Sequence, residues 1–79
     1  MANRFWVGNG GTWDNEDTTH WSATSGGSGG ASVPGPIDDI FFNSSSFTLP
    51  SQIVDIVSNA TYAKSINFTG VTNSPHITF

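Results

Sequence analysis

Few side chains in this sequence could do chemistry: there are six carboxylates, two histidines and no cysteine. His20 together with Asp17 or Asp38 is the best acid–base candidate. Nucleophilic catalysis also needs a nucleophile and an orienting group held in one pocket, and the serines here lie in turn-like repeats. Asp38 and Asp39 are adjacent, so in a strand they point to opposite faces, which does not suit a glycosidase pair. The sequence therefore predicts no enzymatic activity.

A run of oxygen-bearing side chains, Asp14-Asn15-Glu16-Asp17, is the best candidate for a metal site. An EF-hand needs alternating ligands, a central glycine and a distal glutamate, and this spacing is missing. Asp38 and Asp39 would add ligands only if the fold brings them close. The simpler interpretation is one helical turn over 15–19, with Asp14 as N-cap and Asp17 at the third position. We expect no metal and no cofactor.

Aromatic residues are concentrated in the block 4–42, which holds all three tryptophans and eight of the nine glycines. Aromatic rings stack on sugars, so these rings could form a glycan-binding face. The favoured interpretation is that they pack the core, because the chain is short, lacks disulfides and gains a few kcal/mol from each buried aromatic. The candidates for either role are Trp6, Trp13, His20, Trp21, Phe41 and Phe42.

Length and charge restrict the possible functions further. Seventy-nine residues make a single domain with a marginal core, so we expect a homo-oligomer. Charged residues are only 10% of the chain, and Arg4 and Lys64 are the only strong cations, which excludes nucleic-acid binding. No stretch approaches the roughly 18 apolar residues of a membrane span, so no membrane partner is expected. No secretory signal is visible, and we expect the chain to start in the cytosol of the cell that makes it.

Short strands separated by turns are predicted along the whole chain, because no window shows a sustained helical period. Apolar pairs of the form Φ-x-Φ recur at Val54/Ile56, Ile66/Phe68 and Ile77/Phe79, in steps of 12 (54 to 66) and 11 (66 to 77) residues. Such spacing favours a sandwich, barrel or solenoid. The predicted strands cover 5–7, 12–14, 38–42, 47–49, 53–57, 64–68 and 76–79, with turns at 8–11, 43–46, 58–61 and 69–75 and a surface loop at 22–32.

The predicted fold is thus one all-β unit over residues 1–79. A Trp/Gly-rich cap (1–43) leads into short-strand rungs (44–79) that are β-solenoid-like or form a small β-sandwich of the jelly-roll type. A rung of a solenoid stacks on its neighbours and several are needed to bury a core. Phe79 falls in mid-strand, which suggests that these residues are the N-terminal part of a longer chain.

Several unusual short motifs occur in one order, at 1–8, 11–14, 18–22, 26–34, 38–42 and 64–70. In this order they resemble the N-terminal block of tail-fibre-like and other virion structural proteins of tailed phages. The resemblance implies a non-enzymatic virion protein, either a fibre N-terminus or a decoration of capsid or tail, with other virion proteins as partners. Similar blocks open bacterial β-solenoid surface proteins. The alternatives are therefore a module that binds carbohydrate or the host surface, and the N-terminal fragment of a bacterial adhesin.

Overall fold

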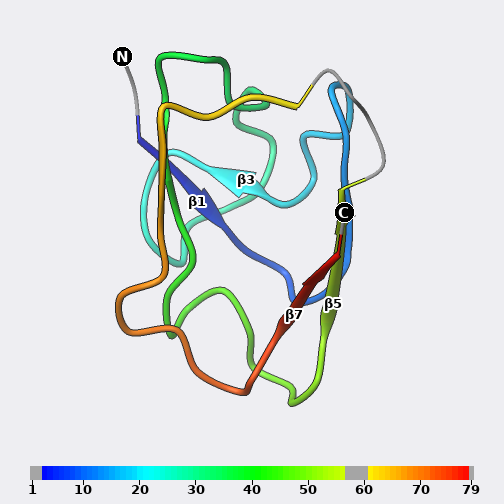
Figure 1. Cartoon of the computed structure of the whole chain (residues 1–79). Coiled ribbons are helices and arrows are strands. Elements are labelled where there is room, and N and C mark those ends of the chain that lie inside the picture. The colour runs from blue at the N-terminus through cyan, green and yellow to red at the C-terminus, as the bar shows by residue number, and fades with distance from the viewer. Residues whose placement is uncertain (1–2, 57–60, 79) are drawn as a thin grey trace.

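The computed structural model describes residues 3–56 and 61–78. These residues form seven short strands and no helix, as the sequence predicted for an all-β chain (Figure 1). None of them therefore belongs to a helix able to cross a membrane. The strands are β1 (Asn3–Trp6), β2 (Gly11–Trp13), β3 (Trp21–Ser22), β4 (Asp39–Phe41), β5 (Ile53–Ile56), β6 (Ser65–Asn67) and β7 (His76–Thr78).

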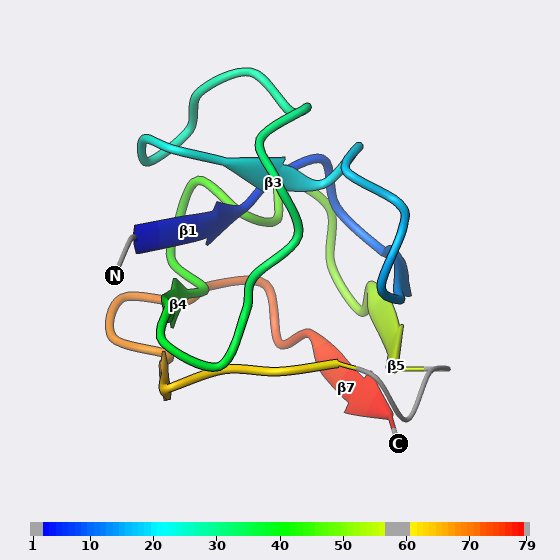
Figure 2. The same cartoon turned by 90° about the horizontal axis from the view of Figure 1, so that it is seen from above.

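The strands form two sheets, with orders β3-β1-β4-β6 and β2-β5-β7. The pairs β1–β4–β6 and β2–β5–β7 are all parallel, and only β3 is antiparallel, against β1. Each pass of the chain therefore adds one strand to each sheet. We call each such pair of strands a rung: β1/β2, then β4/β5, then β6/β7. Figure 2, which looks at the molecule from above, places β3, β1 and β4 in this order down the picture, as in the sheet.

The core lies inside the first two rungs. Successive side chains of β4 and of the residue that follows it point to opposite faces of the sheet. Ile40 and Phe42 are therefore buried, while Phe41 is half-buried. The corresponding residues of the third rung are only partly covered: Ile66 and Phe68 are 45% and 44% exposed. The buried cluster consists of Trp6, Trp13, Trp21, Ile40, Phe42, Phe47 and Val54. Burial therefore decreases from the first rung to the third.

One predicted strand, 47–49, does not form. Phe47 is fully buried, and the backbone N–H groups of Thr48 and Leu49 both donate to Asn9 Oδ1, at 2.8 and 3.1 Å. A side chain thus takes the hydrogen bonds that a neighbouring strand would otherwise satisfy. The prediction of a strand was wrong because apolar composition alone does not distinguish a strand from a segment that buries one ring.

The predicted helical turn over 15–19 is also absent. Asp14 Oδ1 does accept the backbone N–H groups of Glu16 and Asp17, at 2.8 and 2.7 Å, which is the hydrogen bonding of a helix cap. The backbone then continues in bends rather than in a helix. Asp17 repeats the pattern by accepting the N–H of Thr19 at 2.9 Å. Two successive Asx turns therefore replace the helical turn.

The other predicted strands agree with the structure within one or two residues wherever the chain is described. The turn at 43–46 closes with Ser46 N–H donating to Asn43 O at 3.0 Å. The turn predicted at 58–61 lies mostly outside the described residues, as does Phe79. Strand β3 was not predicted, because its two residues lie at the start of the Gly/Ser-rich loop.

Candidate functional site

A column of four stacked rings runs along the interior of the rungs, and we call it the aromatic column. His20 stacks on Trp6 with centroids 4.6 Å apart, and Trp6 stacks on Phe42 at 5.8 Å. Phe42 stacks in turn on Phe68 at 5.1 Å. Trp6, Phe42 and Phe68 come from successive rungs, at or just after β1, β4 and β6. The parallel register of these strands aligns the rings.

The three tryptophans are core residues. Trp6 and Trp21 are 0% exposed and Trp13 is 2% exposed. Trp21 lies edge-on to both of the others, at 88° and 5.1 Å from Trp6 and at 73° and 5.2 Å from Trp13, which is a favourable arrangement for aromatic pairs. A sugar needs an accessible ring face, and none of these three rings offers one.

His20 is half-buried and held by the backbone. Its Nδ1 lies 2.6 Å from Val7 O, and because a carbonyl oxygen only accepts, Nδ1 carries the proton of this hydrogen bond. Gly8 and Gly11 flank the imidazole so closely that a β-carbon on Gly11 would overlap Nε2. The hydrogen bond that fixes His20 therefore goes to a backbone carbonyl and not to a carboxylate, so the ring is a packing element.

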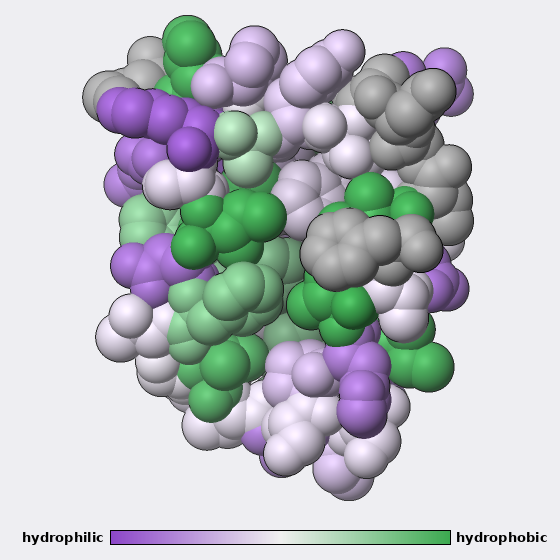
Figure 3. Space-filling model, in the orientation of Figure 1, coloured by the Kyte–Doolittle hydropathy of each residue, from purple (hydrophilic) through white to green (hydrophobic). Residues whose placement is uncertain are grey.

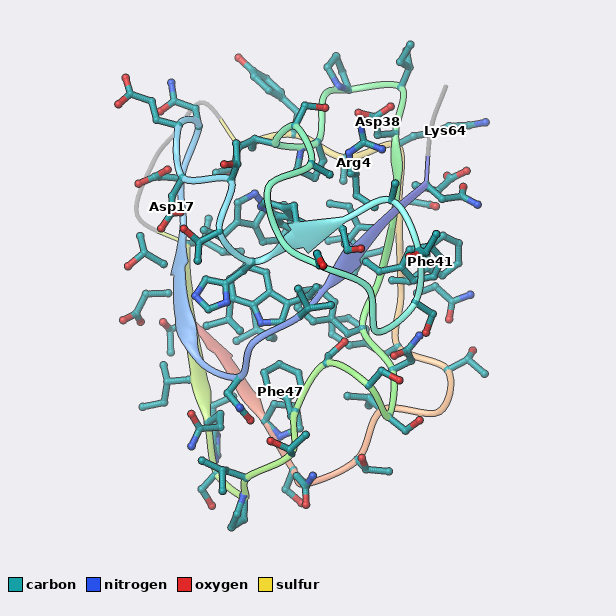
Figure 4. The ribbon with its side chains drawn as sticks, turned by 180° about the vertical axis from the view of Figure 1, so that it is seen from behind. Arg4, Asp17, Asp38, Phe41, Phe47 and Lys64 are labelled. Carbon is teal, nitrogen blue, oxygen red and sulfur yellow. The ribbon has the colours of Figure 1, made fainter. Side chains whose placement is uncertain are left out.

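Phe41 and Phe42 lie on opposite sides of their sheet. Phe42 is fully buried and contacts the rings of the core, whereas Phe41 stacks on Phe5 with centroids 4.9 Å apart. Figure 4 shows Phe47 inside the ribbon and Phe41 at its outer margin. Adjacent positions in a strand thus give these two phenylalanines different surroundings.

The acidic side chains make structural hydrogen bonds. Asp38 Oδ2 accepts the N–H of Gly35 at 2.8 Å, and Asp39 Oδ1 accepts the hydroxyl of Ser65 at 2.6 Å. Asp55 Oδ1 accepts the hydroxyl of Thr78. The last two bonds join the second rung to the third on the outside of each sheet. Within the described residues, no group of three or more His, Cys, Asp or Glu side chains could hold a metal ion.

Asp17 lies on the outer side of the molecule (Figure 4). Hydrogen bonds from the hydroxyl and then from the backbone N–H of Thr19 lower the pKa of its carboxyl below the usual 3.8. A lowered pKa means that the ionised carboxylate stabilises the fold above the unfolded value of 3.8. This contribution is lost as pH falls through the folded pKa.

Replacing Asp17 with asparagine is therefore expected to lower stability slightly above pH 4 and to have no effect well below it. The measurement is the urea midpoint of both proteins between about pH 2 and pH 7. Glu16→Gln is the control, because it removes a neighbouring charge and leaves the bonds from Thr19 in place. A constant difference across the whole range would contradict the assignment.

Two residues that were not among the predicted site residues connect distant segments. Asn9 has a φ of 66° and binds the 48–49 backbone through Oδ1, while its carbonyl accepts the indole N–H of Trp6 at 2.6 Å. Arg4 Nε and Nη2 donate to the carbonyl and hydroxyl of Ser32, at 2.8 and 2.6 Å. The Gly-Asn-Gly-Gly context of Asn9 was the available signal, since asparagine tolerates this backbone conformation.

No pocket is found on the described part of the chain. The run Gly26 to Gly30 has the Gly-x-Ser-x-Gly spacing of a nucleophile elbow, but an elbow needs a strand-to-helix turn and Ser28 lies in an exposed loop. Comparison with protein-family models, with curated proteins and with solved structures finds no match to this chain. Its function must therefore be argued from its own geometry.

Proposed function

We propose that this chain is a non-enzymatic structural protein of a tailed-phage virion, in which β3 and the loop that follows it cap the first rungs of a β-solenoid. The observation that carries this proposal is the stacking of three rungs in parallel register, with Arg4, Ile40 and Ile66 aligned in one sheet and Gly11, Val54 and Ile77 in the other. Parallel stacking of successive chain passes is how a solenoid builds its core.

The strand pairing favours a solenoid over a jelly roll. A jelly roll pairs its strands antiparallel. Among the described residues, the one antiparallel pair is β1–β3, at the outer side of the first rung. That position is where a solenoid needs a cap, because an uncovered first rung would expose its edge.

A structural role also accounts for how the polar residues are used. Asp38, Asp39 and Asp55 are engaged in hydrogen bonds within the fold, and His20 is packed between Trp6 and the glycines. The low content of charged residues, 10%, suits a protein whose surface meets other virion proteins rather than solvent alone. The phage assignment itself rests on the sequence resemblance.

The experiment that tests the proposal is mass spectrometry of purified particles of the phage that encodes this sequence. A particle-associated chain near 8.4 kDa would support a small decoration protein, whereas a much larger chain would support the anchored N-terminus of a fibre. Peptides of an abundant host protein serve as the control for contamination. Absence from clean particles would reject the virion role and favour the bacterial surface protein.

A further inference from the structure

The two ends of the stack of rungs differ in how their edges are covered. At the β3 end, the Trp21 carbonyl accepts the N–H of Ala31 at 3.0 Å, so the loop that follows β3 folds back over it. Arg4 holds the end of this loop through its two hydrogen bonds to Ser32. The chain therefore covers the β3 edge of the four-stranded sheet with its own residues.

At the other end, β6 and β7 are the edge strands of their sheets and together form what we call the open end, residues 65–78. Ile66 and Phe68 are nearly half exposed, and Val71 and Ile77 are only partly buried against the core. Figures 1 and 2 together show that the open end faces the viewer in Figure 1, and Figure 3 has the same orientation. In Figure 3, apolar residues lie across the middle of this face and polar residues surround them. Among the residues that the structure describes, no further strand pairs with the outer edges of β6 and β7, and the open end thus combines two strand edges with an apolar centre.

The open end lacks the charged side chains that protect many edge strands, and its protection is limited to Pro75 before β7 and the short length of β6 and β7. Natural edge strands are usually blunted by charged side chains or bulges. Residues 65–78 contain no Lys, Arg, Asp or Glu, although the whole chain has a net charge of −4. Two copies can therefore bring these faces together without opposing like charges across the centre of the contact.

The aromatic column also ends at this face. One side of the Phe68 ring packs on Phe42, and the ring as a whole remains 44% exposed. A two-fold-related copy places its own Phe68 at the same face, which allows the two rings to pack and the column to continue from one copy into the other. The open end is in this respect complementary to itself.

We propose that the open end binds the open end of a second copy of this chain, so that β6 and β7 extend their sheets antiparallel across a two-fold axis. A head-to-tail assembly would leave the first sheet without a continuation, because the β3 edge is already covered by Ala31 and the loop. This inference rests on the structural role proposed above and specifies the partner.

The size of the face predicts a weak dimer. The extents of the molecule are 28, 24 and 20 Å, and these bound the area of any one end of it. Even the two largest extents enclose only roughly 500 Å² per copy, so the pair buries at most about 1,000 Å². This area is at the lower limit for a specific interface, so dimerisation should depend on concentration in the micromolar range.

The test is sedimentation equilibrium of the 79-residue chain from about 1 μM to about 1 mM. Wild type is expected to pass from monomer to dimer within this range. Ile66→Lys should weaken the dimer at least tenfold, and Ile37→Lys, an identical change at a residue 61% exposed before β4, should leave it unchanged. Tryptophan fluorescence confirms that both variants keep the buried core.

A second variant tests the same contact without adding charge. The chain has no cysteine, so Ile66→Cys places a single thiol in β6, and oxidation should give a covalent dimer if the two edges lie within disulfide distance. Ile37→Cys is the matched control and should remain uncrosslinked. Crosslinking of both variants to the same extent would contradict the proposal.

Two other results would overturn the proposal. Wild type that stays monomeric to about 1 mM would assign the open end to a following rung of the same polypeptide. A dimer that Ile66→Lys does not weaken would place the interface elsewhere. Neither result affects the virion assignment, which the particle experiment decides separately, and absence from particles would leave a measured dimer standing.

Discussion

Replacing Phe42 with alanine is expected to leave most of the chain unfolded at 25 °C. Phe42 is fully buried, and it is the ring through which the rungs meet. Its aromatic neighbours are Trp6, Trp13, Trp21, Phe47 and Phe68. Truncating a buried phenylalanine costs about 3–5 kcal/mol. A core of this size rarely supplies more than about 3–5 kcal/mol in total, so the cost is comparable to the whole free energy of unfolding.

The measurement is urea unfolding followed by tryptophan fluorescence and by far-ultraviolet circular dichroism. Phe41→Ala is the matched control, since it removes the same atoms from the next residue, which is half-buried and stacks on Phe5. It should cost about 1–2 kcal/mol and leave the protein folded. If Phe42→Ala had an unfolding midpoint equal to or above that of Phe41→Ala, the central position of Phe42 would be wrong.

The different environments of Phe41 and Phe42 show which features of this strand can be predicted from the sequence and which cannot. Both were identified as packing candidates, and the turn residues around them correctly placed a strand at 38–42. Alternation then requires that one of the two faces the core, but it does not say which. That choice depends on β4 pairing with β1 and β6, with Ile40 aligned to Arg4 and Ile66. Such pairings join residues 26 to 36 positions apart and leave no local signal.

The same limit explains the errors at 47–49 and 15–19. The segment 47–49 was correctly identified as apolar, and the segment 15–19 as one that begins with a capping residue. The outcome was decided by hydrogen bonds to Asn9 in the first segment and by a second Asx turn at Asp17 in the other. Asparagine and aspartate compete for backbone N–H groups and so displace regular structure. The predicted all-β class survived because it depends on the absence of helical periodicity along the whole chain rather than on any one segment.

The role of His20 was the part of the candidate site least accessible from sequence. The sequence favoured packing over acid–base chemistry for His20, but its neighbours in the chain, Asp17 and Trp21, did not show which groups the ring packs against. What defines its role is the approach of Gly8 and Gly11 on one side and of Trp6 on the other. A glycine in a strand often marks a close approach of another group, and Gly11, which lies in β2, was the signal in the sequence.

Gly11→Ala should therefore destabilise the fold, by about 1–3 kcal/mol. The new β-carbon would overlap His20 Nε2. Gly11 cannot shift easily, because β2 is paired with β5 at Val54, and His20 is held by its stack on Trp6 and its bond to Val7. Gly35→Ala is the control, since the nearest atom to its β-carbon would be 3.8 Å away, and this substitution should be neutral or slightly stabilising.

A double-mutant cycle separates this contact from a general intolerance of alanine in β2. His20→Ala alone should cost about 1–3 kcal/mol, because it removes the stack on Trp6 and the hydrogen bond to Val7. In that background Gly11→Ala no longer meets the imidazole, so its cost should fall by at least about 1 kcal/mol. Urea unfolding of the four proteins gives the coupling energy directly. If Gly11→Ala lowers the free energy of unfolding equally with and without the imidazole, the glycine is required by the backbone of β2 and not by the packing of His20. His20 would then not be a packed member of the aromatic column.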